Sequence, residues 1–388
     1  MNKNIIQIPK TDCVGCAACV TICPVDCITM EEYLGFFYPV VDAGKCIQCG
    51  KCLKACAVNE DETLRNTPQA WYGGYLEPSR MSKHSTSGGI CTELSRLYIQ
   101  QGYLVYGAVF TKDWDLVHRR VKSVDELEQF SGSKYIQSSV PPEVFEEIED
   151  ALKQGQQCLF VGTPCQCGGL INYLTAKNIP TTTLLTVDFM CHGVPSPVLG
   201  KKFIAYLQSK SKKKITYYNF RSKAYGWGGL DRELEYADGS AKVVSAALCP
   251  LHRWFGKHLS LRESCFFCRY RTKNRAADIT VADFWGIAKY YPEIPTRQGV
   301  SAIQINSEKG AQAYEMLEAQ GALISQVVSE QSIWDRKTAL ANFPKPENYE
   351  VFWQAASTLP VEKLIKKYCP LTPIGYLKQI VKALLRRR

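Results

Sequence analysis

The chain has 388 residues, of which 46% are hydrophobic and 22% are charged. This length predicts two or three domains, and the composition is that of a globular protein with a sizeable core. No apolar run reaches the roughly 20 residues that span a bilayer. The first residues, MNKNIIQIPKTDC, lack the apolar core of a secretory signal. We therefore expect a cytoplasmic protein that is not transmembrane.

The formal net charge of +10 and the eighteen cysteines limit the choice of partners. Clustered cysteines without an export signal indicate metal binding rather than disulfides. Metal-bound thiolates would carry negative charge and offset much of this positive charge, so we expect no nucleic-acid partner. The basic segment KQIVKALLRRR is expected to be a solvated terminal helix, with an anionic membrane surface or an acidic partner as the alternative.

Two runs of cysteines near the N-terminus share the spacing C-x2-C-x2-C-x3-C. They are Cys13, Cys16, Cys19 and Cys23, followed by Cys46, Cys49, Cys52 and Cys56. In two-cluster ferredoxins the fourth cysteine of each run binds the cluster of the other run. One [4Fe–4S] cluster should therefore use Cys13, Cys16, Cys19 and Cys56, and the other should use Cys46, Cys49, Cys52 and Cys23. Zinc seldom uses two interleaved sets of this kind.

About residues 8–58 thus resemble a bacterial 2[4Fe–4S] ferredoxin, and the domain is predicted to span residues 1–60. Cys27 is expected to be a packed residue rather than a ligand. The polar segment 61–70 is predicted to be a linker. A larger body follows over residues 71–340, and residues 341–388 are predicted to be a helical basic tail.

The body alternates helix and strand signals. Helices are predicted from Ile90 to Gly102 and over residues 141–155. Strands are predicted over residues 103–110, 158–162, 183–190, 277–284 and 301–306. The second and third of these strands flank the helical sequence GGLINYLTAK, which is typical of a parallel crossover. The fold class is therefore mixed α/β with a small ferredoxin-like domain attached.

Three short segments could hold a phosphate-bearing or aromatic cofactor. Small residues before a helix let backbone N–H groups approach an anion closely, and a loop beyond a strand is a common ligand site. The first segment contains Ser87, Gly88 and Gly89; the second contains Ser131, Gly132, Ser133, Lys134 and Tyr135; the third contains Gly162, Thr163 and Pro164, in a loop that leads with Cys165 into a helix. Each segment alone is a weak signal.

Four further cysteines could form a third metal site. Cys165 and Cys191 each follow a predicted strand, so parallel strands would bring them to the same edge of the sheet. Cys265 and Cys268 form a C-x2-C pair in a basic loop. The spacing alone leaves zinc, plain buried cysteines and the replacement of Cys165 by Cys167 open.

The segments STSGGI, SGSKY, GTPCQ, CHGVPSP and CFFCRYRTKNRAADITVADFWG together resemble the family of coenzyme F-420 hydrogenase and dehydrogenase beta subunits, over about residues 70–335. The family includes 7-hydroxymethyl chlorophyll a reductase. The resemblance implies FAD lined by the three small-residue segments and a [4Fe–4S] cluster on Cys165, Cys191, Cys265 and Cys268. It also matches Asp278, Asp283 and Trp285, which we interpret as framework residues.

The expected function is electron transfer between ferredoxin, or another redox protein, and a small two-electron acceptor through the clusters and FAD. The alternative is an electron-transfer subunit of a larger oxidoreductase complex, without a substrate site of its own. Lys134 is the residue predicted to stabilise an anionic flavin or substrate. His84 and His192 are possible proton donors, but we interpret them as structural and assign no general acid. The substrate, the direction of electron flow and a homo-oligomeric state are left open.

Overall fold

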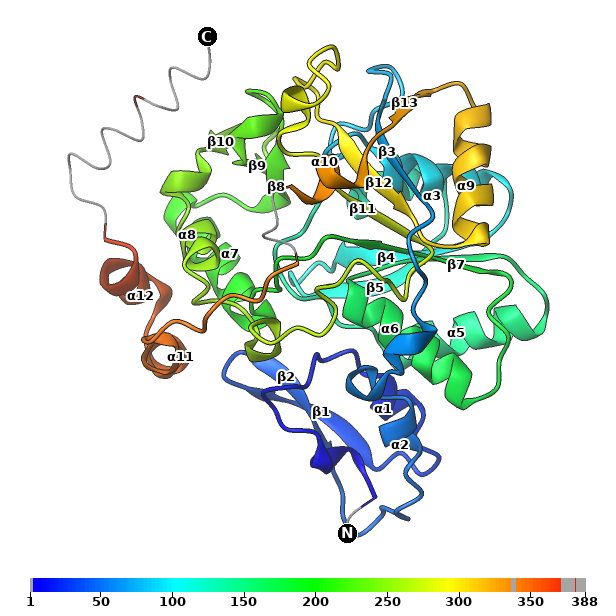
Figure 1. The fold of residues 1–388 in the computed structure, drawn as a ribbon. Coiled ribbons are helices and arrows are strands. Elements are labelled where there is room, and N and C mark those ends of the chain that lie inside the picture. Colours follow the sequence, from blue (N-terminus) through cyan, green and yellow to red (C-terminus); the bar gives the residue numbers. More distant parts are fainter. Residues whose placement is uncertain (1–2, 336–339, 371–380, 382–388) are drawn as a thin grey trace.

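The computed structural model describes residues 3–335, 340–370 and 381. The N-terminal residues form a small domain, drawn in blue at the bottom of Figure 1. Its elements are α1 (Ala18–Thr21), β1 (Ile28–Tyr33), β2 (Phe36–Val41) and α2 (Lys51–Lys54). The antiparallel hairpin of β1 and β2 turns at Leu34 and Gly35, whose φ angles of 47° and 77° are typical of a tight hairpin turn.

The body is built on an eight-stranded mixed sheet with the order β13-β3-β12-β11-β7-β6-β4-β5. The four strands β4, β6, β7 and β11 run parallel to one another, so their carboxyl ends share one edge. The strands are β3 (Ala70–Leu76), β4 (Leu104–Phe110), β5 (Leu116–Val121), β6 (Cys158–Val161), β7 (Leu184–Phe189), β11 (Ile279–Asp283), β12 (Ser301–Ile305) and β13 (Leu323–Val327).

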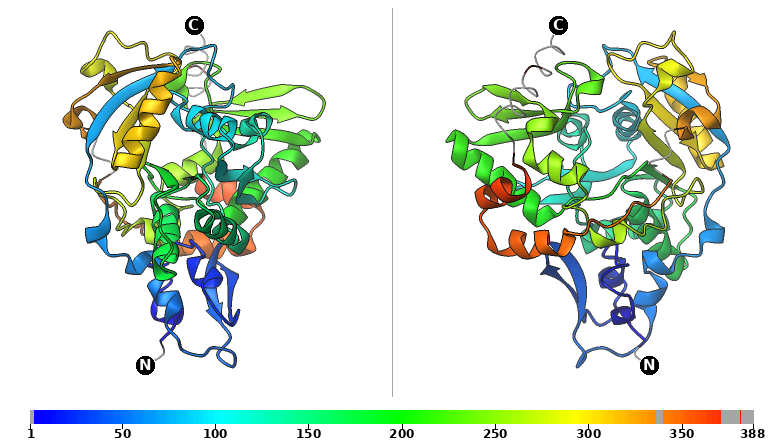
Figure 2. Two further views of the ribbon diagram at one scale, coloured as in Figure 1. Left: turned by 90° about the vertical axis from the view of Figure 1, so that its right-hand side faces the viewer. Right: turned by 60° about the vertical axis from the view of Figure 1, so that its left-hand side comes forward.

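Helices cover both faces of this sheet, because successive side chains on its central strands point to opposite faces. On β4, Val105 packs with helices α3 (Ile90–Gln100) and α9 (Glu308–Ala319). Its neighbour Tyr106 packs with α5 (Pro142–Lys153) and α6 (Pro164–Ala176) on the other face. The short helix α4 (Leu127–Phe130) lies beside α3 and β4. The N-terminal domain shares the hydrophobic core of α5 and α6, and Figure 2 shows it directly below them.

A second core joins the rest of the body to the N-terminal domain. It contains buried residues of the three-stranded sheet β10-β9-β8, of four helices and of β2. The elements are α7 (Pro197–Ser211), β8 (Ile215–Ser222), β9 (Asp231–Tyr236), β10 (Ala241–Val244), α8 (Pro250–Gly256), α11 (Tyr349–Thr358) and α12 (Val361–Tyr368). Trp254, Phe352 and Trp353 are buried at its centre. The helix α10 (Glu330–Trp334) lies after β13.

The mixed α/β class, both predicted helices and all five predicted strands are confirmed, as is the parallel pairing of β6 with β7. One boundary was wrong: α6 begins at Pro164, so Cys165 lies in the helix rather than in the preceding loop. The reason is Thr163, whose side chain accepts a hydrogen bond from Gln166 N while Gln166 Oε1 accepts one from Thr163 N.

The predicted C-terminal tail divides into two parts. Helices α11 and α12 pack on the second core, whereas the basic segment KQIVKALLRRR lies, apart from residue 381, outside the described residues. Over the part of the chain that the structure describes, no helix is both long and apolar enough to cross a membrane.

Candidate redox cofactor sites

The two cysteine runs of the N-terminal domain fold alike. In the first run, the residues on either side of the second cysteine are Gly15 and Ala17, with φ angles of 71° and 65°. In the second run the equivalent residues are Gln48 and Gly50, with φ angles of 55° and 74°. Each left-handed pair turns the backbone sharply, which allows the thiols of one run to face a common centre.

The first thiol group combines cysteines of both runs, as the interleaved prediction requires. Burial and the neighbouring thiols of Cys16 and Cys13 raise the pKa of Cys56 to about 12. Burial raises the pKa of Cys19 well above its usual value, and the neighbouring thiols of Cys16, Cys13 and Cys56 raise it further. The last cysteine of the second run therefore lies with the first three cysteines of the first run.

The second thiol group combines Cys23 with the first three cysteines of the second run. Cys27 links them, because its Sγ lies 3.4 Å from Cys23 Sγ and its pKa is raised to about 12 by burial, Cys23 and Cys46. Asn4 Nδ2 donates to Cys46 Sγ at 3.6 Å. Cys27 itself is buried, consistent with its predicted role as a packed residue.

The first thiol group lies directly against α6 of the body. A side chain at Gly169 would meet Cys16 Sγ at 2.8 Å, so only glycine permits this approach. Asn172 Nδ2 on the same helix donates to Cys56 O at 2.9 Å. Tyr270 Oη donates to Ala57 O at 2.9 Å. The first group is therefore the inner one, close to the body.

Arg262 fills the space between this group and the body, and it is almost completely buried. Its guanidinium donates to Cys13 O at 2.7 Å, to Phe37 O at 2.9 Å and to Gln137 Oε1 at 3.0 Å. It also lies 3.6 Å from Cys13 Sγ and over the ring of Tyr38, at 4.2 Å from the ring centre. Arg262 therefore ties the first cysteine of the inner group to the body.

A third group of thiols gathers beyond the ends of β6 and β7. A small cavity is lined by Cys165, Cys191, Cys265 and Cys268. Cys165 is the second residue of α6, and its Sγ lies 3.2 Å from Thr163 Oγ1. Cys167 instead faces the sheet, where its thiol lies 3.8 Å from Val187 O. The structure therefore brings Cys165, and not Cys167, together with the other three.

The third group fits a cationic metal core. Burial and the neighbouring thiols raise the pKa of Cys191 to about 12 and that of Cys265 to about 11, whereas a bound cation would favour the thiolates. Arg262 and Arg271 also line the cavity and can offset the negative charge of four thiolates. Among the described residues, no three His, Cys, Asp or Glu side chains are close enough together to bind a single metal ion. A four-iron core is larger and needs only one cysteine sulfur at each iron, so the four thiols of the third group can surround it.

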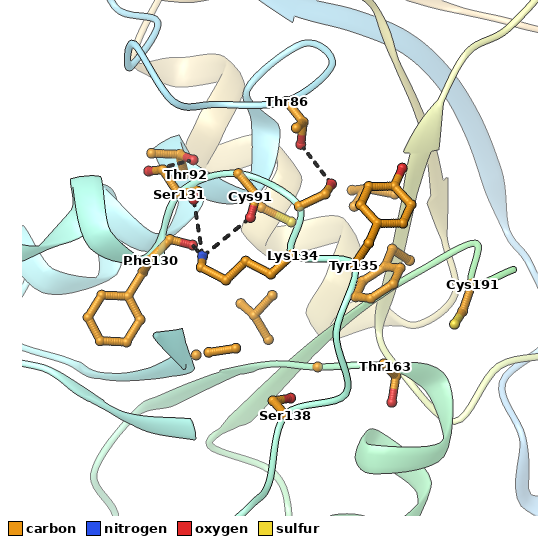
Figure 3. A pocket seen from close by; sticks show the side chains of 18 of the residues that line it. Thr86, Cys91, Thr92, Phe130, Ser131, Lys134, Tyr135, Ser138, Thr163 and Cys191 are labelled. Carbon is orange, nitrogen blue, oxygen red and sulfur yellow. Dashed lines mark hydrogen bonds between the residues drawn. The ribbon is translucent and has the colours of Figure 1, made fainter. Parts of the chain in front are cut away.

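A larger cavity of about 300 Å³ opens beside the third thiol group. All three segments singled out as cofactor-binding contribute to its wall (Figure 3). The contributing predicted residues are Ser87, Gly89, Ser131, Gly132, Ser133, Lys134, Tyr135, Gly162 and Thr163. The segment Cys191–Val194 lies between the two cavities, because Cys191, Gly193 and Val194 line both.

Lys134 places a cation in the wall of this cavity. Its Nζ donates to the carbonyl oxygens of Phe130 at 2.9 Å, Ser131 at 3.1 Å and Gly132 at 3.4 Å. Burial lowers the pKa of Lys134 to about 7. These three carbonyls take up the three N–H donors of an ammonium group, and over the described residues no carboxylate forms an ion pair with Lys134. When it is protonated, Lys134 adds positive charge to the wall of the cavity.

Asp283 also lines this cavity, where neighbouring side chains hold it in place. Arg221 donates to both of its carboxylate oxygens, at 2.7 and 3.0 Å, and Trp227 Nε1 donates at 2.8 Å. Arg221 also donates to Tyr135 Oη at 3.1 Å. Trp285 stacks on Trp227 with 4.2 Å between ring centres. These contacts agree with the interpretation of Asp283 and Trp285 as framework residues.

Two predicted cofactor residues do not line the larger cavity. Gly88 lies behind the wall, where its N–H donates to Ser301 Oγ at 2.9 Å and a side chain would meet Gly74 O at 2.3 Å. Pro164 lines the smaller thiol cavity instead. Both positions therefore shape the site from outside the larger cavity.

The two histidines interpreted as structural are engaged by other side chains. His84 lies 2.8 Å from Glu128 and stacks on Tyr217. His192 Nε2 lies 2.9 Å from His258 Nε2. Asp278 accepts hydrogen bonds from Thr186 and Ser307, which agrees with its framework interpretation.

Sequence reasoning missed Arg262, Arg221 and His118. Arg262 and Arg221 contact residues that lie far away in the sequence. The only sequence signal was that Arg262 lies three residues before Cys265, a predicted cluster ligand. His118 lines the larger cavity, where burial lowers its pKa to about 4 and keeps the ring neutral. No motif marks His118.

Two known families match the two parts of the chain that hold these thiol groups. The family described as the C terminus of the "Coenzyme F420 hydrogenase/dehydrogenase, beta subunit" matches residues 155–331, which hold all four cysteines of the third group. The "4Fe-4S dicluster domain" matches residues 12–59, which hold both cysteine runs. Residues 155–331 form a domain of the family found at the C terminus of F420 hydrogenase/dehydrogenase beta subunits. The resemblance predicted from the sequence is thereby confirmed, and residues 12–59 are a [4Fe–4S] cluster-binding domain that serves electron transfer.

Curated relatives match parts of the chain. One subunit of the F(420)H(2) dehydrogenase of Methanosarcina mazei is 22% identical over 205 residues, which are 49% of this chain and 56% of the relative. NADH-quinone oxidoreductase subunit I of Pelobacter propionicus is 34% identical over 68 residues, 15% of this chain and 37% of the relative. The chain thus spans about half or less of the length of these relatives.

A chain in the solved structure of the F420-reducing [NiFe] hydrogenase complex of Methanosarcina barkeri is also similar. The likeness covers 79% of this chain and 93% of that chain, with a TM-score of 0.47 and 14% sequence identity.

Proposed function

We propose that this chain is an iron–sulfur flavoprotein that exchanges electrons between a redox protein, such as ferredoxin, and a two-electron organic acceptor. The N-terminal domain would hold two [4Fe–4S] clusters, the third thiol group a further cluster, and the larger cavity FAD. Clusters exchange single electrons, whereas a flavin exchanges one or two.

One observation carries this proposal: the cofactor cavity and the third thiol cavity share the segment Cys191–Val194 as a common wall. The volume of about 300 Å³ falls in the range of small-molecule sites. Lys134 offers its charge to an anionic cofactor, and Tyr135 is held by Arg221 at the cavity wall. The inner thiol group lies next to α6, whose first turn carries Cys165. These neighbourhoods support an electron path from the second thiol group through the inner and third groups to the cavity.

The proposal is tested by the iron, sulfide and flavin content of protein purified without oxygen. Three clusters and one flavin predict about twelve irons and one FAD per chain. Cys265→Ser should remove about four irons and leave the N-terminal clusters intact. Cys167→Ser is the matched control, because Cys167 is buried near Cys165 but faces the sheet. Equal iron loss in the two variants, or protein with zinc and no flavin, would contradict the proposal.

A second function, that of an electron-transfer subunit in a larger oxidoreductase, is favoured by the relatives, which are named as subunits. The two functions predict different results for the isolated chain. A self-contained reductase, reduced anaerobically, should be reoxidised by a small organic acceptor in a screen of such compounds. An electron-transfer subunit should co-purify with a catalytic partner and be reoxidised only in its presence.

A further inference from the structure

The two N-terminal thiol groups differ in their distance from the body. The inner group is buried against α6, whereas in the other group Cys49 is exposed and Cys46 is partly exposed. Lys3 N donates to Gln48 Oε1 at 2.8 Å, which fixes this loop beside the start of the chain. Figure 2 shows that start at the end of the domain farthest from the body. The second thiol group is therefore the one next to solvent.

The surface around Cys49 is basic with an apolar centre. Residues 43–59 contain three lysines and no acidic residue. Ile6 and Ile47 are 57% and 60% exposed, and they lie in the two segments that the hydrogen bond between Lys3 and Gln48 joins. We call this surface the distal face; its residues are Lys3, Ile6, Lys45, Ile47, Cys49, Lys51 and Lys54, all of which are exposed.

The lysines give the distal face a net positive charge. Four thiolates around a [4Fe–4S]²⁺ core carry a formal charge of about −2, which alone would repel an acidic protein. Lys3, Lys45, Lys51 and Lys54 outweigh that charge, and Asp42, 3.8 Å from Lys45, offsets only part of theirs. Lysines at a rim mainly accelerate association, while exposed apolar residues at the centre provide contact area.

We propose that the distal face docks a small acidic electron-carrier protein, which delivers one electron per encounter to the second thiol group's cluster. The carrier is oxidised by one electron, and this chain is reduced by one. This inference rests on the proposed function, because it requires a cluster beneath Cys49. A transient complex of this kind needs a small interface, which matches a surface of two apolar and four basic side chains.

Binding is the direct test. An acidic bacterial 2[4Fe–4S] ferredoxin serves as the probe, and its affinity for the full-length holoprotein is measured by titration calorimetry at several salt concentrations. The test variant carries Lys45→Glu, Lys51→Glu and Lys54→Glu. The control carries Lys112→Glu, Lys242→Glu and Lys363→Glu, which make the same change in net charge at exposed positions of the body.

We expect the test variant to bind the probe at least about tenfold more weakly at low salt, with the difference shrinking as salt increases. The control variant should stay within about twofold of the wild type by the same screening argument. Carbodiimide cross-linking should join carboxylates of the probe to Lys45, Lys51 or Lys54. Stopped-flow reduction of the holoprotein by the reduced probe should slow in parallel with the loss of binding.

Several results would overturn the docking inference. They are equal weakening in both variants, cross-links confined to the body, no binding of the probe by wild type, or a change only in self-association measured by light scattering. Iron content separates this failure from failure of the proposed function. Variants that retain about twelve irons and the full uptake of electrons from dithionite show that the clusters are intact. Wild-type protein without iron would instead refute the proposed function itself.

Discussion

Replacing Arg262 by glutamine should loosen the N-terminal domain from the body. The substitution removes three buried hydrogen bonds from a charged donor, to Cys13 O, Phe37 O and Gln137 Oε1. Each such bond contributes about 1.5–3 kcal/mol. The buried guanidinium costs several kcal/mol of desolvation, so the net loss on breaking the network should be about 3–5 kcal/mol.

This loss is large enough to measure as domain opening. Since 1.4 kcal/mol corresponds to a factor of ten, the undocked population should rise about a hundredfold or more. Hydrogen–deuterium exchange of the peptide covering residues 8–20, monitored by mass spectrometry, reports this opening directly. Glutamine retains an amide NH2 group with two N–H donors, so Arg262→Met, which retains none, should increase the exchange at least as much.

Arg120→Gln is the matched control, because Arg120 is an exposed arginine on β5 of the body. It should leave the exchange of residues 8–20 unchanged. If Arg262→Gln exchanged at the wild-type rate in the same experiment, the reasoning that Arg262 holds the domain in place would be refuted.

Three further predictions concern α6, the core and the cofactor cavity. Gly169→Ala places a methyl group 2.8 Å from Cys16 Sγ. It should weaken the contact between the N-terminal domain and α6 by about 1–3 kcal/mol, which would be measured as a lower Tm. Gly256→Ala is the control and should not lower the Tm, because a methyl group there would have no atom within 4 Å. Burial alone would raise the pKa of Glu149, but hydrogen bonds from Lys153, Lys177 and Tyr173 lower it to about 2. Its stabilisation is therefore present above about pH 4.5 and lost as the pH falls towards about 2, so Glu149→Gln should flatten the decrease in unfolding free energy over that interval. Lys134→Met should weaken FAD binding about tenfold or more, measured by release of flavin fluorescence on dilution. The affinity of the wild type should fall as the pH rises above about 7, because Lys134 then loses its charge, and that pH dependence should be absent from the variant.

Much of the fold and of the thiol arrangement could be predicted from local patterns. The repeated cysteine spacing indicated two equivalent loops, and the paired φ angles around the second cysteine of each run show them. Parallel strands β6 and β7 brought Cys165 and Cys191 to one edge because each cysteine follows its strand closely.

The remaining features depend on information that the local sequence does not contain. Cys165 and Cys167 are two residues apart, about 200° around a helix, so the choice between them depends on where α6 begins. Thr163 sets that beginning through its capping hydrogen bonds. Arg262 reaches Cys13 across 249 residues of sequence, and no pattern near either residue reveals the contact.

The N-terminal domain is anchored on two sides. Gly169 lies against Cys16 at one side, and at the other the hairpin turn at Gly35 lies against Trp353 and Ser196, where a side chain would be 2.6–2.7 Å from both. Because the domain is held at two points, it cannot move as a whole to carry electrons from one redox site to another. Electrons would have to tunnel across a constant gap, so the internal transfer rate should be independent of solvent viscosity.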